Sequence, residues 1–211
     1  MHNVYPISRH TLLRFLNLFV KKIEGIEHIP KNGPYIIACK HTAPLDGEII
    51  GAAIVPKINR KIHFITNVAK LGPLWEKMIA ERWAGCITFD REQRGRCLEV
   101  AAEHLRQGKV VGIFPSGLLE EQQALNDYSG KTGVARLALW SRAPVIPIGI
   151  RNFHYLSLRT MIWKHLTHPH TMVIRIGKPM TFPDAYSKET TYPLLRDMTK
   201  SIMSTLDALS N

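Results

Sequence analysis

Cysteine is scarce in this chain of 211 residues, in which only Cys39, Cys86 and Cys97 occur. An odd number of cysteines without C-x-x-C spacing excludes a disulfide framework and a cysteine zinc site, and favours a reducing compartment. Long apolar runs are also absent, since no stretch approaches the ~18 consecutive apolar residues of a membrane-spanning helix. The N-terminus lacks the apolar core and small-residue cleavage site of a secretory signal. We therefore expect a protein that does not cross a membrane.

Acidic residues are fewer than basic ones: the chain has 17 Asp and Glu and 28 Lys and Arg, which gives a formal net charge of +11 at pH 7. This excess favours an anionic partner, such as nucleic acid, lipid headgroups or a phosphorylated substrate. The basic residues are scattered rather than interleaved with aromatic ones, which disfavours nucleic acid. A content of 45% hydrophobic and 21% charged residues is typical of a globular domain and excludes disorder as the main state.

Short apolar runs alternate with longer helical patterns, which predicts a single α/β domain with a mostly parallel central sheet flanked by helices. Because most of the short runs are apolar throughout, we expect them to be strands covered on both faces. The expected strands are Pro34–Cys39, Lys61–Thr66, Gly85–Phe89, Lys109–Phe114, Val145–Ile150 and Thr171–Ile176. The expected helices are Leu45–Val55, Leu71–Trp83, Arg94–Gln107, Gly133–Arg142 and Tyr192–Leu209.

The segment Ser8–Lys22 has a narrow polar stripe and a wide apolar face, which predicts an amphipathic helix. Such a helix either docks on the core or lies among lipid headgroups with its cations toward anionic lipid. We accordingly divide the chain into an amphipathic N-terminal helix within residues 1–23, which is interfacial in the second case, and a main domain that spans residues 24–211.

A polar turn follows the expected strand that ends at Cys39, and it holds His41 and, five residues later, Asp46. A spacing of five does not place two side chains on one helix face, and Pro44 disfavours a helix through the preceding residues. A tight turn can instead fold Asp46 back toward the imidazole. A carboxylate bonded to one ring nitrogen fixes the tautomer and lets the other nitrogen take a proton from a hydroxyl. The alternative is a histidine in a turn beside an aspartate that caps a helix.

Four blocks, in this order, resemble the glycerophospholipid acyltransferases, whose best-known members are 1-acylglycerol-3-phosphate acyltransferases. They are KHTAPLDG (Lys40–Gly47), GCITFDRE (Gly85–Glu92), IFPSGLLEE (Ile113–Glu121) and APVIPIGI (Ala143–Ile150). The stretch GIEHIPKNGPYIIAC before the first block and GKTGVARLAL before the last are also similar to the family. The likeness spans about residues 24 to 150.

The resemblance implies an enzyme that moves a fatty acyl chain from an acyl thioester to a hydroxyl of a lysophospholipid. In the family the histidine is the general base and the aspartate orients it, roles that fall here on His41 and Asp46. Lys70 and Arg91 correspond to residues that hold the phosphate of the acceptor. Phe114, Pro115, Ser116 and Gly117 correspond to a further substrate-binding block. The family needs no cofactor or metal, and uses acyl-coenzyme A or acyl carrier protein as co-substrate.

One departure concerns the acceptor, because Ser116 stands where the family usually has a glutamate linked to acceptor binding. The resemblance thus supports acyl transfer more strongly than it supports 1-acylglycerol-3-phosphate as the acceptor. An acyltransferase for another lipid, such as a glycolipid or an aminolipid, is an alternative, and so is a non-catalytic lipid-binding protein with the same fold. In each case we expect a lipid partner, an anionic membrane surface and a peripheral location on the cytoplasmic face.

Two further candidate sites are weaker. Cys39 lies close to His41, but a cysteine in an apolar strand is more often an inert core residue than a nucleophile. Four histidines cluster late in the chain without a neighbouring cysteine or carboxylate at ligand spacing, so we expect no metal site there. They are His154, His165, His168 and His170.

Overall fold

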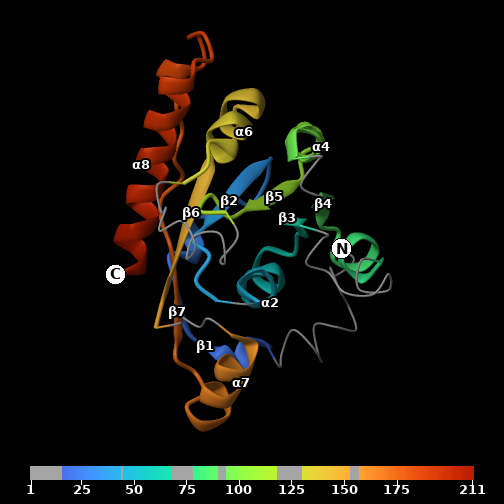
Figure 1. The fold of residues 1–211 in the computed structure, drawn as a ribbon, viewed down its shortest axis with the longest axis vertical. Coiled ribbons are helices and arrows are strands. Elements are labelled where there is room, and N and C mark those ends of the chain that lie inside the picture. Colours follow the sequence, from blue (N-terminus) through green and yellow to red (C-terminus); the bar gives the residue numbers. More distant parts are fainter. Residues whose placement is uncertain (1–15, 44, 68–77, 90–93, 118–129, 153–156) are drawn as a thin grey trace.

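Seven strands form one sheet in the order β1-β7-β6-β2-β5-β3-β4 (Figure 1). The computed structural model describes residues 16–43, 45–67, 78–89, 94–117, 130–152 and 157–211. Neighbouring strands run parallel, except that β6 and β7 are antiparallel. The strands are β1 (Val20–Glu24), β2 (Tyr35–Cys39), β3 (Ile62–Asn67), β4 (Ile87–Phe89), β5 (Val110–Ile113), β6 (Val145–Arg151) and β7 (Met172–Ile176). The predicted α/β class with a mostly parallel sheet is confirmed.

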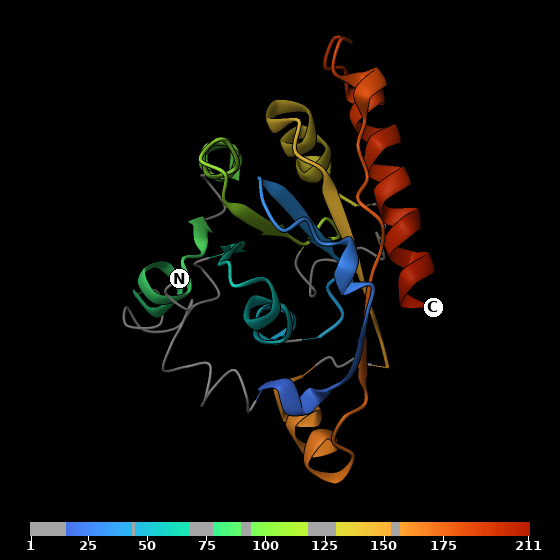
Figure 2. The same ribbon diagram turned by 180° about the vertical axis from the view of Figure 1, so that it is seen from behind.

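Helices cover both faces of this sheet, as Figures 1 and 2 show from opposite sides. The α-helices are α2 (Asp46–Ile58), α4 (Arg94–Arg106), α6 (Gly133–Ser141), α7 (Leu158–Thr167) and α8 (Tyr192–Ser210). Short helical segments are η2 (Asn17–Phe19), η3 (Ile26–His28), η5 (Ile79–Ala84) and η6 (Pro183–Ala185). Alternate residues of β2 enter two separate cores: Ile37 packs in the core that contains α2, and Ile36 in the core that contains α4, α6 and α8.

The six strands expected from apolar runs are all present, and β2, β5 and β6 are buried nearly throughout. Four of the expected helices correspond to α2, α4, α6 and α8. In α4 the stripe of Cys97, Ala101 and Leu105 is buried as its four-residue spacing predicts. Most of the expected helix Leu71–Trp83 lies outside the described residues, and its last part forms the π-helix η5.

The expected helix over Ser8–Lys22 is wrong at its C-terminal end. Residues 1–15 lie outside the described part of the chain, but η2 stops at Phe19 and Val20–Glu24 form strand β1. This strand pairs with β7, about 150 residues later, and crosses the predicted boundary between residues 23 and 24. Backbone pairing with a distant strand thus overrides a local helical pattern. Helix α7 was not predicted either.

The strand directions bring several segments to one edge of the sheet. The carboxyl ends of the parallel strands β2, β5 and β6 lie at this edge. Because β7 is antiparallel to β6 and β1 is parallel to β7, the amino ends of β7 and β1 lie there too. In open α/β sheets, ligands bind outside the carboxyl ends of the parallel strands. Among the helices of the described segments, none is both long and apolar enough to cross a membrane.

Gly149 is a close-packing point between β6 and α8. A Cβ atom at Gly149 would lie 2.5 Å from the carbonyl carbon and the Cβ of Leu209. We expect Gly149→Ala to force α8 away from the sheet and to lower the free energy of unfolding by about 3 kcal/mol in urea titrations. The matched control is Gly51→Ala within α2, where an added Cβ meets nothing within 4 Å; it should stabilise the protein by about 0.5–1 kcal/mol. Equal effects of the two variants would contradict this packing.

The rings of His63 of β3 and His104 of α4 lie next to each other, with centroids 4.6 Å apart and planes tilted by 33°. Burial lowers the pKa of His63, and the positive charges of Lys109 and Lys61 lower it further. The hydrogen bond between its Nδ1 and the carbonyl of Gly85 raises the pKa, but by less. Burial and the neighbouring His63 lower the pKa of His104. Both rings are therefore favoured in their neutral form in the folded protein.

The pair predicts a loss of stability in acid. Since the folded-state pKa values lie below the unfolded ones, the unfolded chain binds protons that the folded chain does not, and stability falls as pH drops below about 6.5. We expect His104→Gln to reduce the loss of melting temperature between neutral and mildly acid pH, as measured by thermal scans. An unchanged or steeper loss in this variant would contradict the role of the pair.

Candidate active site

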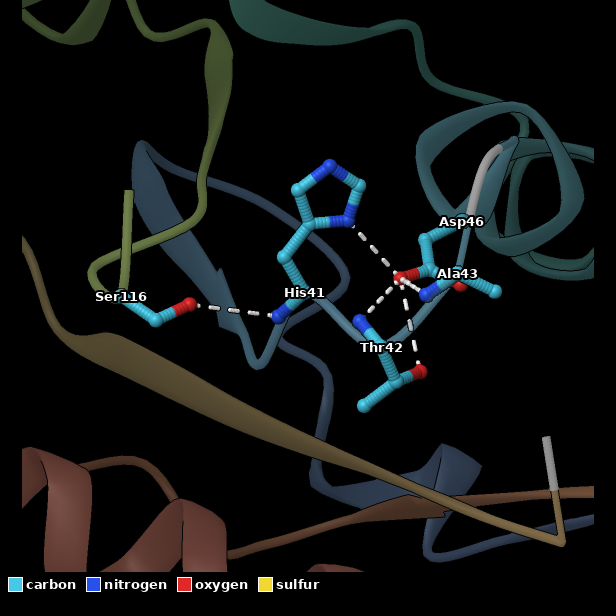
Figure 3. A network of polar contacts seen from close by, with 5 residues as sticks. All are labelled: His41, Thr42, Ala43, Asp46 and Ser116. Carbon is cyan, nitrogen blue, oxygen red and sulfur yellow. Dashed lines mark hydrogen bonds and ion pairs between the residues drawn. The ribbon is translucent and has the colours of Figure 1, made fainter. Parts of the chain in front are cut away.

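A single buried carboxylate organises the turn between β2 and α2. Asp46 is the first residue of α2 and is fully buried. Its Oδ2 accepts hydrogen bonds from the backbone N–H of Thr42 at 2.6 Å and of Ala43 at 2.9 Å (Figure 3). The preceding Leu45 has a φ of 67°, a left-handed conformation that is costly for a branched side chain. The turn thus holds a strained backbone that the buried hydrogen bonds stabilise.

The imidazole of His41 forms a hydrogen bond with the same oxygen of Asp46. Its Nδ1 lies 3.0 Å from Oδ2 of Asp46, and its side chain is 22% exposed, whereas that of Asp46 is 0% exposed. A carboxylate only accepts, so Nδ1 carries the hydrogen and Nε2 of the neutral ring presents its lone pair. Figure 3 shows Nε2 on the side of the ring that points away from Asp46. The structure therefore contains a histidine whose tautomer is fixed by a buried partner and whose second nitrogen faces outward.

Two aromatic rings support the imidazole from the side. Phe114, one residue beyond β5, lies with its ring centroid 4.7 Å from that of His41. Phe64 of β3 stacks on Phe114 at 5.7 Å. Gly112 makes room for Phe64, because a Cβ at that position would lie 2.3 Å from the Phe64 ring. The candidate substrate residue Phe114 thus packs against the histidine itself.

Ser116 binds the backbone of His41. The N–H of His41 donates to the Ser116 hydroxyl at 3.3 Å, and the serine is only 4% exposed. The turn from Phe114 to Gly117 is closed by a bond from the Gly117 N–H to the Phe114 carbonyl, and Gly117 has a φ of 85°. A side chain at Gly117 would be strained, and its Cβ would lie 2.8 Å from the Lys131 side chain. The hydrogen bond between Ser116 and His41 thus joins the turn after β5 to the turn after β2.

Two further contacts set the surroundings of the pair. Lys40 reaches Asp207 of α8, with 2.6 Å between Nζ and Oδ1, which ties the residue before His41 to the last helix. Cys39 is fully buried, and burial followed by the charge of Asp46 raises the pKa of its thiol well above the ordinary value. A buried neutral thiol is a poor nucleophile, in agreement with its expected place in the core.

The structure brings His41, Asp46, Phe114, Pro115, Ser116 and Gly117 together at the carboxyl edge of β2 and β5. Pro115 contributes its carbonyl, which accepts from the N–H of Lys131 at 2.7 Å. Lys70 and Arg91 lie outside the described residues. Within the described ranges, no three His, Cys, Asp or Glu side chains gather as a metal site.

Sequence reasoning missed the supporting residues Thr42, Phe64 and Lys131. Thr42 offers both its N–H and, at 3.4 Å, its hydroxyl to Asp46. Its place between His41 and Asp46 was the available signal, since short turns are often closed by backbone bonds to an aspartate. For Phe64 the signal was Gly112, because a glycine inside a strand indicates close approach of another group. For Lys131 the available signal was its place in the stretch GKTGVARLAL, which is similar to the family.

Chemically, the site can take a proton from a hydroxyl placed at Nε2 of His41 and return it to a leaving group. The pair is rigid, since Asp46 is held by backbone bonds and the imidazole is held by Asp46 and Phe114. A rigid base with a fixed tautomer is suited to general acid–base catalysis.

Comparisons with known proteins agree with this chemistry. The chain is 25% identical over 201 residues to the 1-acyl-sn-glycerol-3-phosphate acyltransferase of Bacillus subtilis, with 90% of this chain and 88% of that protein covered. It is 26% identical over 215 residues to the alpha form of that enzyme from Mus musculus, with 95% and 70% covered.

The fold is similar to the crystal structure of a 1-acyl-sn-glycerophosphate acyltransferase from Thermotoga maritima. The TM-score is 0.61 at 20% identity, and the match covers 96% of this chain and 81% of the other. The model of the family described as Acyltransferase matches residues 21–151, which include every described residue of the candidate site. This chain therefore belongs to the acyltransferase family and is an enzyme that transfers acyl groups.

Proposed function

We propose that this enzyme transfers a fatty acyl chain from an acyl thioester to a hydroxyl of a lysophospholipid, with 1-acylglycerol-3-phosphate as the leading acceptor, in phospholipid biosynthesis. The observation that carries the proposal is the bond between Nδ1 of His41 and the buried Asp46, at the position where the resembling family has its base. The names of the similar enzymes from Bacillus subtilis and Mus musculus support the acceptor.

The proposed reaction needs no acyl-enzyme intermediate. Nε2 of His41 takes the proton of the acceptor hydroxyl while its oxygen attacks the thioester carbonyl carbon. The tetrahedral intermediate collapses, the carbon–sulfur bond breaks, and the leaving sulfur receives the proton from His41. Asp46 stabilises the imidazolium that forms between the two steps.

The donor and the acceptor site follow from the resemblance. Acyl-coenzyme A or acyl carrier protein would be the co-substrate, without a cofactor or metal. Both donors are anionic, as is a bilayer with anionic lipid, and the net charge of +11 suits each of them. Lys70 and Arg91 would hold the phosphate of the acceptor, for which arginine offers a planar pair of donors. The enzyme would act as a peripheral protein at the cytoplasmic face of a membrane.

A second candidate is acyl transfer to another lipid, such as a glycolipid or an aminolipid. Ser116 favours it, because a short buried hydroxyl that accepts from the backbone of His41 replaces the glutamate usual in the family. The intact His41 and Asp46 pair argues against a non-catalytic lipid-binding protein.

We expect His41→Ala to lower turnover about 10³-fold or more, because the base is lost, and Asp46→Asn to lower it substantially, because the tautomer is no longer fixed. The measurement is thiol release from a long-chain acyl-coenzyme A, with and without lysophosphatidic acid in detergent micelles.

The exposed His168 provides the control His168→Ala, which should retain activity. Acceptor-dependent release that survives in His41→Ala would refute the assigned base. If the wild type releases no thiol, acyl carrier protein and a panel of lysolipids and glycolipids decide between the two candidates.

The contact of Ser116 with His41 predicts a specific kinetic effect. Since the hydroxyl positions the backbone of the base, Ser116→Ala should lower kcat about tenfold and leave KM for the acceptor within about twofold. Ser116→Thr retains a hydroxyl and is expected to retain most of kcat. A rise in KM for the acceptor with unchanged kcat would instead show that Ser116 binds the acceptor.

A further inference from the structure

Helix α7 presents large apolar side chains to solvent. Trp163 is 69% exposed and Leu166 73%, and Ile162 is also exposed. Met161 is the only buried residue among the side chains of α7 that the structure describes. Positions 162, 163 and 166 fall on one side of a helix, opposite Met161. Among the described side chains of α7, Met161 packs on the core, and the helix turns an apolar face outward.

The start of β1 lies beside this helix. The N–H of His170, just after α7, donates to the carbonyl of Leu18 at 3.0 Å, and Figures 1 and 2 both show η2 and β1 next to α7 at the end of the molecule. Leu18 is itself exposed. We call Leu18, Ile162, Trp163 and Leu166 together the α7 surface.

The stretch of sequence that contains α7 is rich in cations and has no acidic residue. From residue 142 to residue 183 the sequence contains six Lys or Arg and no Asp or Glu. Arg159 and Lys164 of α7 are exposed. Lys21, Lys22 and Lys57 line a hollow of about 380 Å³ between β1 and α2, with Glu24 paired to Lys22 at 2.9 Å. Arg159 lies one turn before Trp163 on the same side of α7, and Lys164 lies beside the apolar positions. Long cationic side chains next to apolar ones are suited to the boundary between anionic headgroups and acyl chains.

The α7 surface also lies at the edge of the sheet that carries His41. Helix α7 follows the carboxyl end of β6, which is parallel to β2, and η2 precedes the amino end of β1 at the same edge. A bilayer in contact with α7 would therefore face the side of the domain from which the histidine is reached.

We propose that the α7 surface inserts into the headgroup region of a bilayer that contains anionic lipid, with Trp163 and Leu166 below the phosphates and Arg159 and Lys164 at their level. This proposal rests on the proposed function, in which the acceptor is a membrane lipid, and it adds the surface that contacts the membrane. Three of the four residues of this surface lie on α7, outside the segment Ser8–Lys22 of the predicted N-terminal helix, and Leu18 lies within that segment. A second copy of the chain is a poorer occupant, because two such cationic surfaces would repel each other.

The experiment is co-sedimentation of the full chain with vesicles of phosphatidylcholine mixed with phosphatidylglycerol, and with phosphatidylcholine alone. We expect Trp163→Gln with Leu166→Gln to weaken binding to the mixed vesicles about tenfold. Arg159→Glu with Lys164→Glu should also weaken binding to the mixed vesicles, and should change binding to vesicles of phosphatidylcholine alone very little. The matched control is Trp140→Gln with Tyr192→Gln, two exposed aromatic residues on α6 and α8, which should bind as the wild type does.

Two results would overturn the proposal. One is equal binding by the wild type and the Trp163 and Leu166 double variant. The other, seen by sedimentation velocity without lipid, is a wild-type dimer that this double variant converts to a monomer, which would assign the surface to a second copy. Binding is measured without substrates, so the expected vesicle result combined with no thiol release from any donor would refute the proposed function and leave the membrane contact standing.

Discussion

The buried carboxylate of Asp46 is the constraint on which the site depends. One oxygen accepts from two backbone N–H groups and from the imidazole of His41, and it does so in a place without access to water. A buried carboxylate must be compensated by donors, so the turn from Thr42 to Asp46 has few conformations open to it. The left-handed backbone of Leu45 is tolerated because these bonds hold it. The bond from Nδ1 of His41 to Oδ2 of this aspartate sets the orientation of the imidazole.

The remaining support comes from a second turn, the one after β5. Phe114 packs on the His41 ring, and Ser116 accepts from the His41 backbone. Since β2 and β5 are adjacent parallel strands, their carboxyl ends meet, and two turns far apart in the sequence act as one structure. At the position of Ser116 the resembling family usually has a glutamate, whereas here the serine hydroxyl helps to hold the backbone of His41, the proposed base.

The α7 surface and the candidate active site lie at the same edge of the sheet. The antiparallel β7 brings the chain back so that η2, the start of β1 and α7 all border the edge that carries His41. Apolar and cationic side chains gather on these segments, whereas the sheet behind them is covered on both faces by helices. An enzyme with this arrangement would meet a lipid surface with the side that holds its chemistry.

The α/β class, six of the seven strands and four α-helices could be predicted from the sequence, because buried strands and one-sided helices leave periodic apolar patterns. The sequence also predicted a turn that can bring Asp46 to His41, and left open a histidine beside a capping aspartate. The strand Val20–Glu24 depends on its pairing with β7, about 150 residues later, and the direction of β7 depends on its pairing with β6, so neither follows from a local pattern. The contacts of Ser116 and Phe114 with His41 likewise come from the tertiary structure. Such contacts depend on which strands are neighbours, and the local pattern of side chains does not specify that order.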